Sequence, residues 1–363
     1  MASGWVSSSF GGVRGGHLRC KSFMPPFVSI CIPSYNRPLE LVRLLKTINT
    51  ACAKDIEIVI CENDSLQREQ IVAQVESFMQ ASVLDVKLFL NEKNLGYDAN
   101  LRRLVEKASG EFIIFMGDDD LFETENLPSF IQFLKNHPEL GYVLKTHTLI
   151  HRDGTKELFK YFPEDKFFEK GVDAYQTLFR KSVLISGFCV KRAYAALLQT
   201  DQFDGTLLYQ LYLLAEVTLH HPSAFCSIPL TCQDESLRAV PLFGSSDTEK
   251  SLYKPGEITV ANSLNFMDGF FKITAYIDAK YGLRSSGFMK RSFSKYAYPV
   301  ISIQRNKGSK TFRNYCKQLE ERIDINQSFY YYIYYYSLLF FGKSFCDKMI
   351  VRLKRVLGST PNL

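Results

Sequence analysis

Short apolar runs alternate with amphipathic stretches over the first half of the chain. Their Val, Ile, Leu and Phe content predicts buried strands over residues 27–33, 56–61, 86–91 and 112–117. Apolar residues at helical spacing predict helices from Leu39 onward and over 69–81, 97–110 and 126–136, and residues 142–154 indicate one more strand and a turn. The alternation predicts an α/β fold with a Rossmann-like, mostly parallel sheet flanked by helices.

The second half of the chain has a different pattern. It indicates a strand over 182–192, an apolar helix over 205–217, a long polar loop over 232–257 and mostly helices over 258–322. Residues 1–25 are rich in Gly and Ser and lack the apolar core of a signal peptide, so we expect a flexible leader. We therefore expect three further units: an α/β domain over 26–257, a helical region over 258–326 and a tail over 327–363.

The tail combines an aromatic run with basic residues. The run at 329–342 reads FYYYIYYYSLLFFG and is too short to span a bilayer, which takes roughly 20 apolar residues. Followed by Lys348 and Arg352, it favours a peripheral contact with a membrane surface through 329–357. The alternative is a tyrosine-rich helix packed on its own domain or on a second subunit.

Composition narrows the class of protein. The 363 residues carry a formal net charge of +6, which suits an anionic ligand or membrane but does not indicate a nucleic-acid binder. The nine cysteines show no zinc-binding spacing. Their odd number and their place in apolar runs predict reduced, mostly buried thiols in a cytoplasmic protein.

Polar, turn-forming segments follow each of the first four predicted strands. Ligands of such sheets bind outside the carboxyl ends of the strands, so PSYNR, ENDS, NEKNLG and DDD are expected to share one edge. Tyr35 offers stacking, and Asn36 and Arg37 offer polar or phosphate contacts. Glu62, Asn63 and Asp64 offer acceptors for a base or a ribose, although ENDS could instead only cap the next helix.

Three adjacent aspartates, Asp118, Asp119 and Asp120, follow the fourth strand. Adjacent carboxylates repel one another, and a solvated turn or a helix cap is the simpler explanation for them. We favour a Mg²⁺ or Mn²⁺ site, because hard cations take carboxylate oxygens together with substrate phosphates. Neither a P-loop nor GxGxxG is present, so side chains and turns would hold the nucleotide.

These motifs resemble a known family. VSICIPSYNR, EIVICENDS and NLGYDANLRRLVEKASGEFIIFMGDDDLF, in this order, are similar to the inverting glycosyltransferase family 2, closest to bacterial O-antigen and capsule transferases of the abequosyltransferase type. The resemblance covers about residues 27–125, and more weakly extends to about 260. It implies a GT-A fold and transfer of a sugar from a nucleotide diphosphate.

The resemblance also implies roles for particular residues. The segment Pro33, Ser34, Tyr35, Asn36 and Arg37 would line the nucleotide pocket, Glu62 and Asn63 would grip base or ribose, and Asn94, Gly96 and Asn100 would lie beside the nucleotide. The metal motif of the family usually begins one residue earlier, at the position of Gly117. Asp118 and Asp120 would then form a shifted DxD with Asp119 between them.

Inverting transfer also needs a general base, which deprotonates the acceptor hydroxyl. By the resemblance Asp204 is the best match, with Asp201, Glu216 and Asp234 as rivals. Arg238 and Lys254, in the long loop, would close on the diphosphate, unless this is only a surface loop.

The predicted function is metal-dependent transfer of one sugar from a nucleotide-sugar to a glycan acceptor. A lipid-linked acceptor would account for a tail on the cytoplasmic face of the inner membrane. Replacing Asp120 by Ala is then expected to abolish transfer. Two alternatives are a nucleotidyltransferase and a non-catalytic glycan-binding protein on the same fold.

Overall fold

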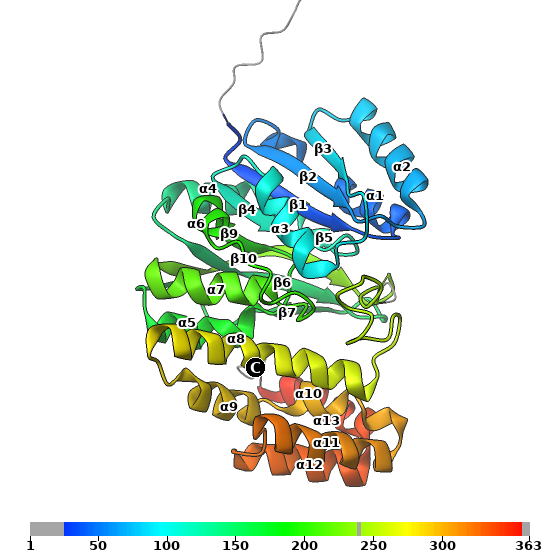
Figure 1. The fold of residues 1–363 in the computed structure, drawn as a ribbon, viewed down its shortest axis with the longest axis vertical. Helices are drawn as coiled ribbons and strands as arrows, with labels where there is room; N and C mark the ends of the chain where they lie inside the picture. The colour runs from blue at the N-terminus through cyan, green and yellow to red at the C-terminus, as the bar shows by residue number, and fades with distance from the viewer. Residues whose placement is uncertain (1–24, 238–240, 358–363) are drawn as a thin grey trace, which may run out of the picture.

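The computed structural model describes residues 25–237 and 241–357, and the predicted leader lies almost wholly outside them. One ten-stranded sheet forms the centre of this part of the chain (Figure 1). Its strands are β1 (Val28–Ser34), β2 (Ile56–Glu62), β3 (Asp85–Leu90), β4 (Phe112–Phe115), β5 (Leu121–Phe122), β6 (Tyr142–Ile150), β7 (Lys156–Phe159), β8 (Lys166–Phe168), β9 (Phe188–Lys191) and β10 (Ser223–Asp234).

Helices follow or separate most of these strands, and six more complete the C-terminal region. They are α1 (Pro38–Lys46), α2 (Arg68–Ala81), α3 (Tyr97–Lys107), α4 (Leu127–Asn136), α5 (Val172–Leu178), α6 (Arg192–Leu197), α7 (Tyr209–His220), α8 (Val260–Tyr281), α9 (Ser285–Lys295), α10 (Tyr298–Ser302), α11 (Ser309–Ile323), α12 (Phe329–Phe341) and α13 (Lys343–Leu357). Short 3₁₀ turns lie at Thr50–Cys52, Thr124–Asn126, Phe179–Ser182 and Arg305–Lys307.

The sheet is mixed, with a parallel first half. Its strands run in the order β3-β2-β1-β4-β9-β6-β10-β5, and β3, β2, β1 and β4 pair in parallel. β9 is antiparallel to both β4 and β6, whereas β10 is parallel to β6. The α/β class with flanking helices is thus confirmed, and the sheet is parallel over β3, β2, β1 and β4 but mixed beyond them. The carboxyl ends of β1, β2, β3 and β4 share one edge, as the pattern predicts.

Alternating side chains of the central strands build two cores. On β1, Ile30 and Ile32 face one core with α1 and α4, while Cys31 faces the other with α3 and α7. β2 repeats the alternation, which is the period of two that a buried strand imposes. The second core continues without interruption into α8, α9 and α11, so the C-terminal helices pack on the α7 side of the sheet (Figure 1).

The helix predicted over 205–217 begins later, at Tyr209. Leu207 has φ +61°, in the left-handed region that interrupts a helix. The buried Asp98 of α3 accepts hydrogen bonds from the backbone N–H groups of Leu207 and Tyr209, at 2.9 Å each. A contact between α3 and the start of α7 therefore sets where this helix begins.

The aromatic run forms α12, which packs by one side only. Tyr331 and Leu338 are fully buried, and the Tyr334 ring contacts Tyr298 of α10. Phe329 and Phe340 are 77% and 73% exposed. Within the described residues, every helix is too short or too polar to cross a membrane.

Eight of the nine cysteines lie in the described part of the chain, and all eight are buried and free. Cys20 lies outside it. Burial raises the pKa of the Cys61 thiol to about 12, so this side chain stays protonated and acts as a small apolar group. The prediction of buried thiols is confirmed for these residues.

Candidate functional site

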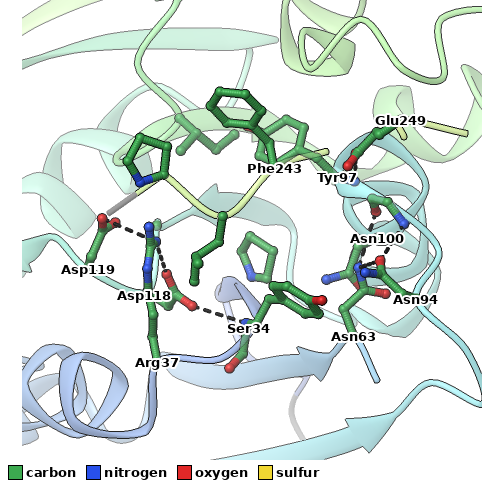
Figure 2. Close-up of a pocket in the computed structure, with 17 residues that line it drawn as sticks. Ser34, Arg37, Asn63, Asn94, Tyr97, Asn100, Asp118, Asp119, Phe243 and Glu249 are labelled. Carbon is green, nitrogen blue, oxygen red and sulfur yellow. Dashed lines mark hydrogen bonds and ion pairs between the residues drawn. The ribbon is translucent and has the colours of Figure 1, made fainter. Parts of the chain in front are cut away.

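A pocket of about 220 Å³ opens where β1, β2 and β4 end. Ten residues proposed from sequence for donor binding line it: Pro33, Ser34, Tyr35, Arg37, Asn63, Asn94, Gly96, Asn100, Asp118 and Asp119. Figure 2 shows Arg37, Asp118 and Asp119 on one side and the three asparagines on the other. The pocket therefore has an ionic end and an amide end.

At the ionic end, one guanidinium bridges two carboxylates. Nη1 of Arg37 lies 2.7 Å from Oδ1 of Asp118 and 3.1 Å from Oδ2 of Asp119. The backbone N–H of Tyr35 donates to the other oxygen of Asp118, at 3.2 Å. These three side chains carry one more negative than positive charge, so the ionic end has a net negative charge.

Burial dominates the electrostatics of Asp118. It raises the pKa of this carboxyl to about 6, with Asp119 adding to the rise and Arg37 opposing it. One guanidinium therefore compensates the two carboxylates incompletely, and a further cation would be stabilised here. The ligand atoms available to such a cation are carboxylate oxygens, which suit Mg²⁺ or Mn²⁺. Among the described residues, no group of three or more His, Cys, Asp or Glu side chains is arranged to hold a metal.

The three aspartates do not converge. The Asp120 N–H donates to the Gly117 carbonyl at 3.3 Å, which makes 117–120 a turn with Asp118 and Asp119 at its corner. Asp120 is buried instead beside Ser186 and Gln233, which donate to its carboxylate. Neighbouring aspartates, and not the alternating pair 118 and 120, therefore face the pocket.

The amide end is held by a network of asparagines. The Asn63 amide donates to the Asn94 side chain at 2.9 Å and accepts from the Leu95 N–H at 3.0 Å. Asn91 donates to the side chains of both Asn63 and Asn100, at 3.0 and 2.9 Å. These bonds keep amide groups of Asn63, Asn94 and Asn100 at the pocket wall, where they can contact a base or a ribose.

Three other predicted donor-binding residues, at the end of β2 and in the turns after β1 and β2, are not part of the pocket lining. Asn36 and Asp64 have φ of +55° and +56°, which Asn and Asp tolerate best among residues with a Cβ. Glu62 accepts from the N–H groups of Asp64 and Ser65 and pairs with Arg68 at 2.5 Å. These contacts hold the turn between β2 and α2 and do not cap the helix, whose N-cap residue is Gln67. The donor role of the three residues stays a prediction.

Several lining residues were missed by the sequence analysis. They are Tyr97, Ile185, Pro241, Leu242, Phe243 and Glu249. Glu249 accepts hydrogen bonds from the N–H groups of Tyr97 at 2.6 Å and Gly244 at 2.8 Å, and thereby fixes the long loop against the start of α3. A Cβ on Gly96 would lie 2.7 Å from Ser246 Oγ, so this close approach requires glycine. The predicted functional loop does reach the pocket, through other residues than those proposed.

Of the two loop cations proposed to close on the diphosphate, Arg238 lies outside the described residues. Lys254 is exposed and pairs with Glu257 at 2.5 Å, outside the pocket lining.

Asp204, the predicted base, is not among the lining residues. Arg102 of α3 holds its carboxylate with both terminal nitrogens, one of them at 2.7 Å. The rival Glu216 is buried and paired with Lys280 at 2.7 Å, which ties α7 to α8. Asp201 and Asp234 lie outside the lining too. The assignment of Asp204 stays a prediction.

Comparison with known proteins identifies the part of the chain that carries this pocket. Residues 29–184 match the model of glycosyl transferase family 2. The GalNAc(5)-diNAcBac-PP-undecaprenol beta-1,3-glucosyltransferase of Campylobacter jejuni is 27% identical over 45% of this chain and 49% of its own length. The abequosyltransferase RfbV of Salmonella typhimurium is 26% identical over 31% of this chain and 34% of its own. The chain spans about half or less of the curated relatives it matches.

Solved structures with a related arrangement were also found. The mannosyltransferase PcManGT from Pyrobaculum calidifontis, in complex with GDP-Man and Mn²⁺, has 14% identity and a TM-score of 0.46, with 89% of each chain covered. S. aureus TarS 1-349 with UDP-GlcNAc has 16% identity and a TM-score of 0.46, over 82% of this chain and 89% of that one. The match to the family model agrees with the motifs and the sheet edge already described: residues 29–184 are similar to glycosyl transferase family 2.

Proposed function

We propose that the protein transfers one sugar from a nucleotide-diphosphate sugar to a hydroxyl of a glycan acceptor, with inversion at the anomeric carbon. The observation that carries the proposal is the pocket with an ionic end at Asp118 and Asp119 and an amide end at Asn63 and Asn100. Such a pocket matches a ligand that has a charged diphosphate next to a ribose and a base. Relatives named as glycosyltransferases support the same chemistry.

In the proposed reaction, the acceptor hydroxyl attacks the anomeric carbon in line with the departing diphosphate. A C–O bond forms to the acceptor, and the C–O bond to the diphosphate breaks with its electron pair on the diphosphate. Arg37 lies where it can stabilise the charge that develops on the diphosphate. The hydroxyl proton passes to a carboxylate base, a role that we propose for Asp204 from its resemblance to the family pattern.

Asp118 and Asp119 would hold a divalent cation together with the diphosphate. One or two carboxylates plus substrate phosphates are the usual ligands of Mg²⁺, so the lack of a larger acidic cluster in the described residues fits this mode. A bound cation would neutralise charge on the leaving group. Asp120, turned towards Ser186, is not part of the proposed ligand set.

We further propose a lipid-linked acceptor and a place on the cytoplasmic face of the membrane. One relative is named for an undecaprenol-linked substrate, α12 exposes aromatic side chains, and α13, which follows it, exposes Lys348 and Arg352. Exposed aromatic rings and basic residues on neighbouring helices suit the interface of an anionic membrane.

Flotation with vesicles tests the membrane contact. We expect binding to anionic vesicles, weaker binding to neutral ones, and loss of both when Phe340 and Phe341 are replaced by Ser. Leu197→Ser on α6, which is 84% exposed elsewhere, serves as the matched control. Equal flotation of the double variant and the control would refute a contact through α12.

A thermal-shift screen of nucleoside diphosphates with and without Mn²⁺ tests the main proposal. We expect one nucleotide to raise Tm only when Mn²⁺ is present, followed by release of that nucleoside diphosphate during sugar transfer. Release of pyrophosphate instead would indicate a nucleotidyltransferase. No stabilisation by any nucleotide would leave the non-catalytic glycan-binding alternative.

A further inference from the structure

A second cavity, of about 530 Å³, lies between the region similar to family 2 and the C-terminal helices. Its walls are mainly apolar and aromatic: Phe266 and Phe270 of α8, Phe293 of α9, and Val300 and Ile303 around α10 are among them. The cavity is within the size range of sites for small molecules. Its lining is far more apolar than that of the donor pocket, so it suits a hydrocarbon and not a sugar nucleotide.

The donor pocket and the apolar cavity share a wall. Tyr97, the first residue of α3, and Phe243, in the long loop, line both. Figure 2 shows these two side chains at the edge of the donor pocket. A molecule in the apolar cavity therefore ends next to the place where we expect the donor, which is where an acceptor must present its hydroxyl.

One cation lies in the lining of this apolar cavity. The Arg180 guanidinium stacks over the Tyr296 ring, 4.0 Å from its centroid, and its Nε has no hydrogen-bond partner in the structure. No carboxylate of the described residues forms an ion pair with it. Burial lowers the pKa of Arg180, and burial with the nearby charges of Arg180 and Lys166 lowers the pKa of Lys181 to about 8. A partly buried cation without a carboxylate partner can bind an anionic ligand.

The cavity also lies close to the proposed membrane contact. α10 contributes Val300 to the lining, and through Tyr298 it packs on Tyr334 of α12. Ile303, at the rim, is 40% exposed. A chain that leaves the membrane at α12 could follow α10 into the cavity.

We propose that this cavity is the acceptor lipid site: it takes the isoprenoid chain of a lipid-phosphate acceptor, and Arg180 binds the phosphate at its head. The inference rests on the proposed function, because it assigns the acceptor of that same reaction. The apolar lining selects the chain, the unpaired guanidinium selects the phosphate, and the shared wall directs the attached sugar to the donor pocket.

Equilibrium dialysis with farnesyl phosphate, kept below its micelle concentration, tests the site in the full chain. We expect binding that Arg180→Gln weakens by about tenfold to a hundredfold, since hydrogen bonds to charged groups contribute about 1.5–3 kcal/mol. The affinity for farnesol, which lacks the phosphate, is expected to change by less than about threefold in the same variant. Arg103→Gln, a partly exposed arginine of α3 outside the cavity, is the matched control.

A second variant blocks the chain itself. Val300→Trp should fill the cavity and weaken the binding of both farnesyl phosphate and farnesol by at least about tenfold. If it does not fold, Ile303→Trp at the exposed rim replaces it, and Leu197→Trp is the control for either one. Unchanged binding in both Arg180→Gln and the folded blocking variant would overturn the proposal. So would equal competition by inorganic phosphate, or binding to phospholipid vesicles alone.

The two proposals fail in different ways. Loss of nucleotide binding in the thermal-shift screen, with farnesyl phosphate binding intact, would refute the transferase function and leave a lipid-phosphate site. The opposite result would leave the transferase function and refute the assignment of the acceptor site.

Discussion

Replacing Arg37 by Gln leaves two pocket carboxylates without their shared cation. Arg37 and Asp118 are only 15% and 6% exposed, so their pair behaves as a largely buried one. Breaking such a pair costs about 3–5 kcal/mol, and the open pocket places the effect near the lower figure. A loss of about 3 kcal/mol lowers Tm by roughly 4 °C for a chain of this size. The matched control is Arg43→Gln on α1, whose pair with Glu40 is 3.6 Å long and worth about 1 kcal/mol or less.

The assay is thermal unfolding at pH 8 and pH 5, with Mn²⁺ titrated into each variant. The loss of stability in Arg37→Gln should be larger at pH 8, because protonation below about pH 6 removes the repulsion that Arg37 offsets at Asp118. Mn²⁺ should stabilise this variant more than the wild type, since the guanidinium no longer competes for both carboxylates. A pH-independent loss equal to that of the control, without any effect of Mn²⁺, would refute this account of the ionic end.

Three further outcomes are expected. Asp118→Asn should weaken Mn²⁺-dependent nucleotide binding, measured by calorimetry, by about tenfold or more, whereas Asp120→Asn should change it by less than about threefold. A larger effect of Asp120→Asn would instead support a metal site that includes Asp120. If Asp204 is the base, Asp204→Asn should lower kcat by about 10²–10⁴, whereas Arg102→Gln should mainly lower Tm. Equal losses of kcat in both variants would show that the Asp204–Arg102 pair has a structural role and not a catalytic one. For Asp98, burial raises the pKa to about 7 in the fold, so the fold favours the protonated acid and loses stability as pH rises from about 4 to 7. Urea unfolding of Asp98→Asn should show a flatter profile over that range, and an unchanged slope would contradict it.

The parts of the fold that local patterns determine could be predicted from the sequence. Ile30 and Ile32 on one face of β1, with Cys31 on the other, follow from the period of two that strands impose. The four turns after the first strands could be placed at one edge because parallel strands share a direction. Most of the donor pocket follows from these two local rules alone.

Non-local contacts escaped the prediction. Glu249 meets Tyr97 across 152 residues of sequence, and no periodicity encodes such a pair. Tyr97 did carry a signal, an aromatic side chain at the first position of a helix after Gly96 in a polar rim segment. The sequence left open which of Asp118, Asp119 and Asp120 would hold a metal, because the turn over 117–120 that follows the end of β4 at Phe115 has no periodicity that orients its side chains.

The donor pocket and the apolar cavity carry different charges, and these charges favour different ligands. At the ionic end of the donor pocket, Arg37 faces two carboxylates, so a diphosphate can bind there only if a cation accompanies it. In the apolar cavity Arg180 faces no carboxylate of the described residues, so a phosphate can bind there directly. Metal dependence should therefore be confined to the donor. We therefore expect EDTA to abolish nucleotide binding and to leave farnesyl phosphate binding unchanged. That result would place the nucleotide in the donor pocket and farnesyl phosphate in the apolar cavity, as the charges predict.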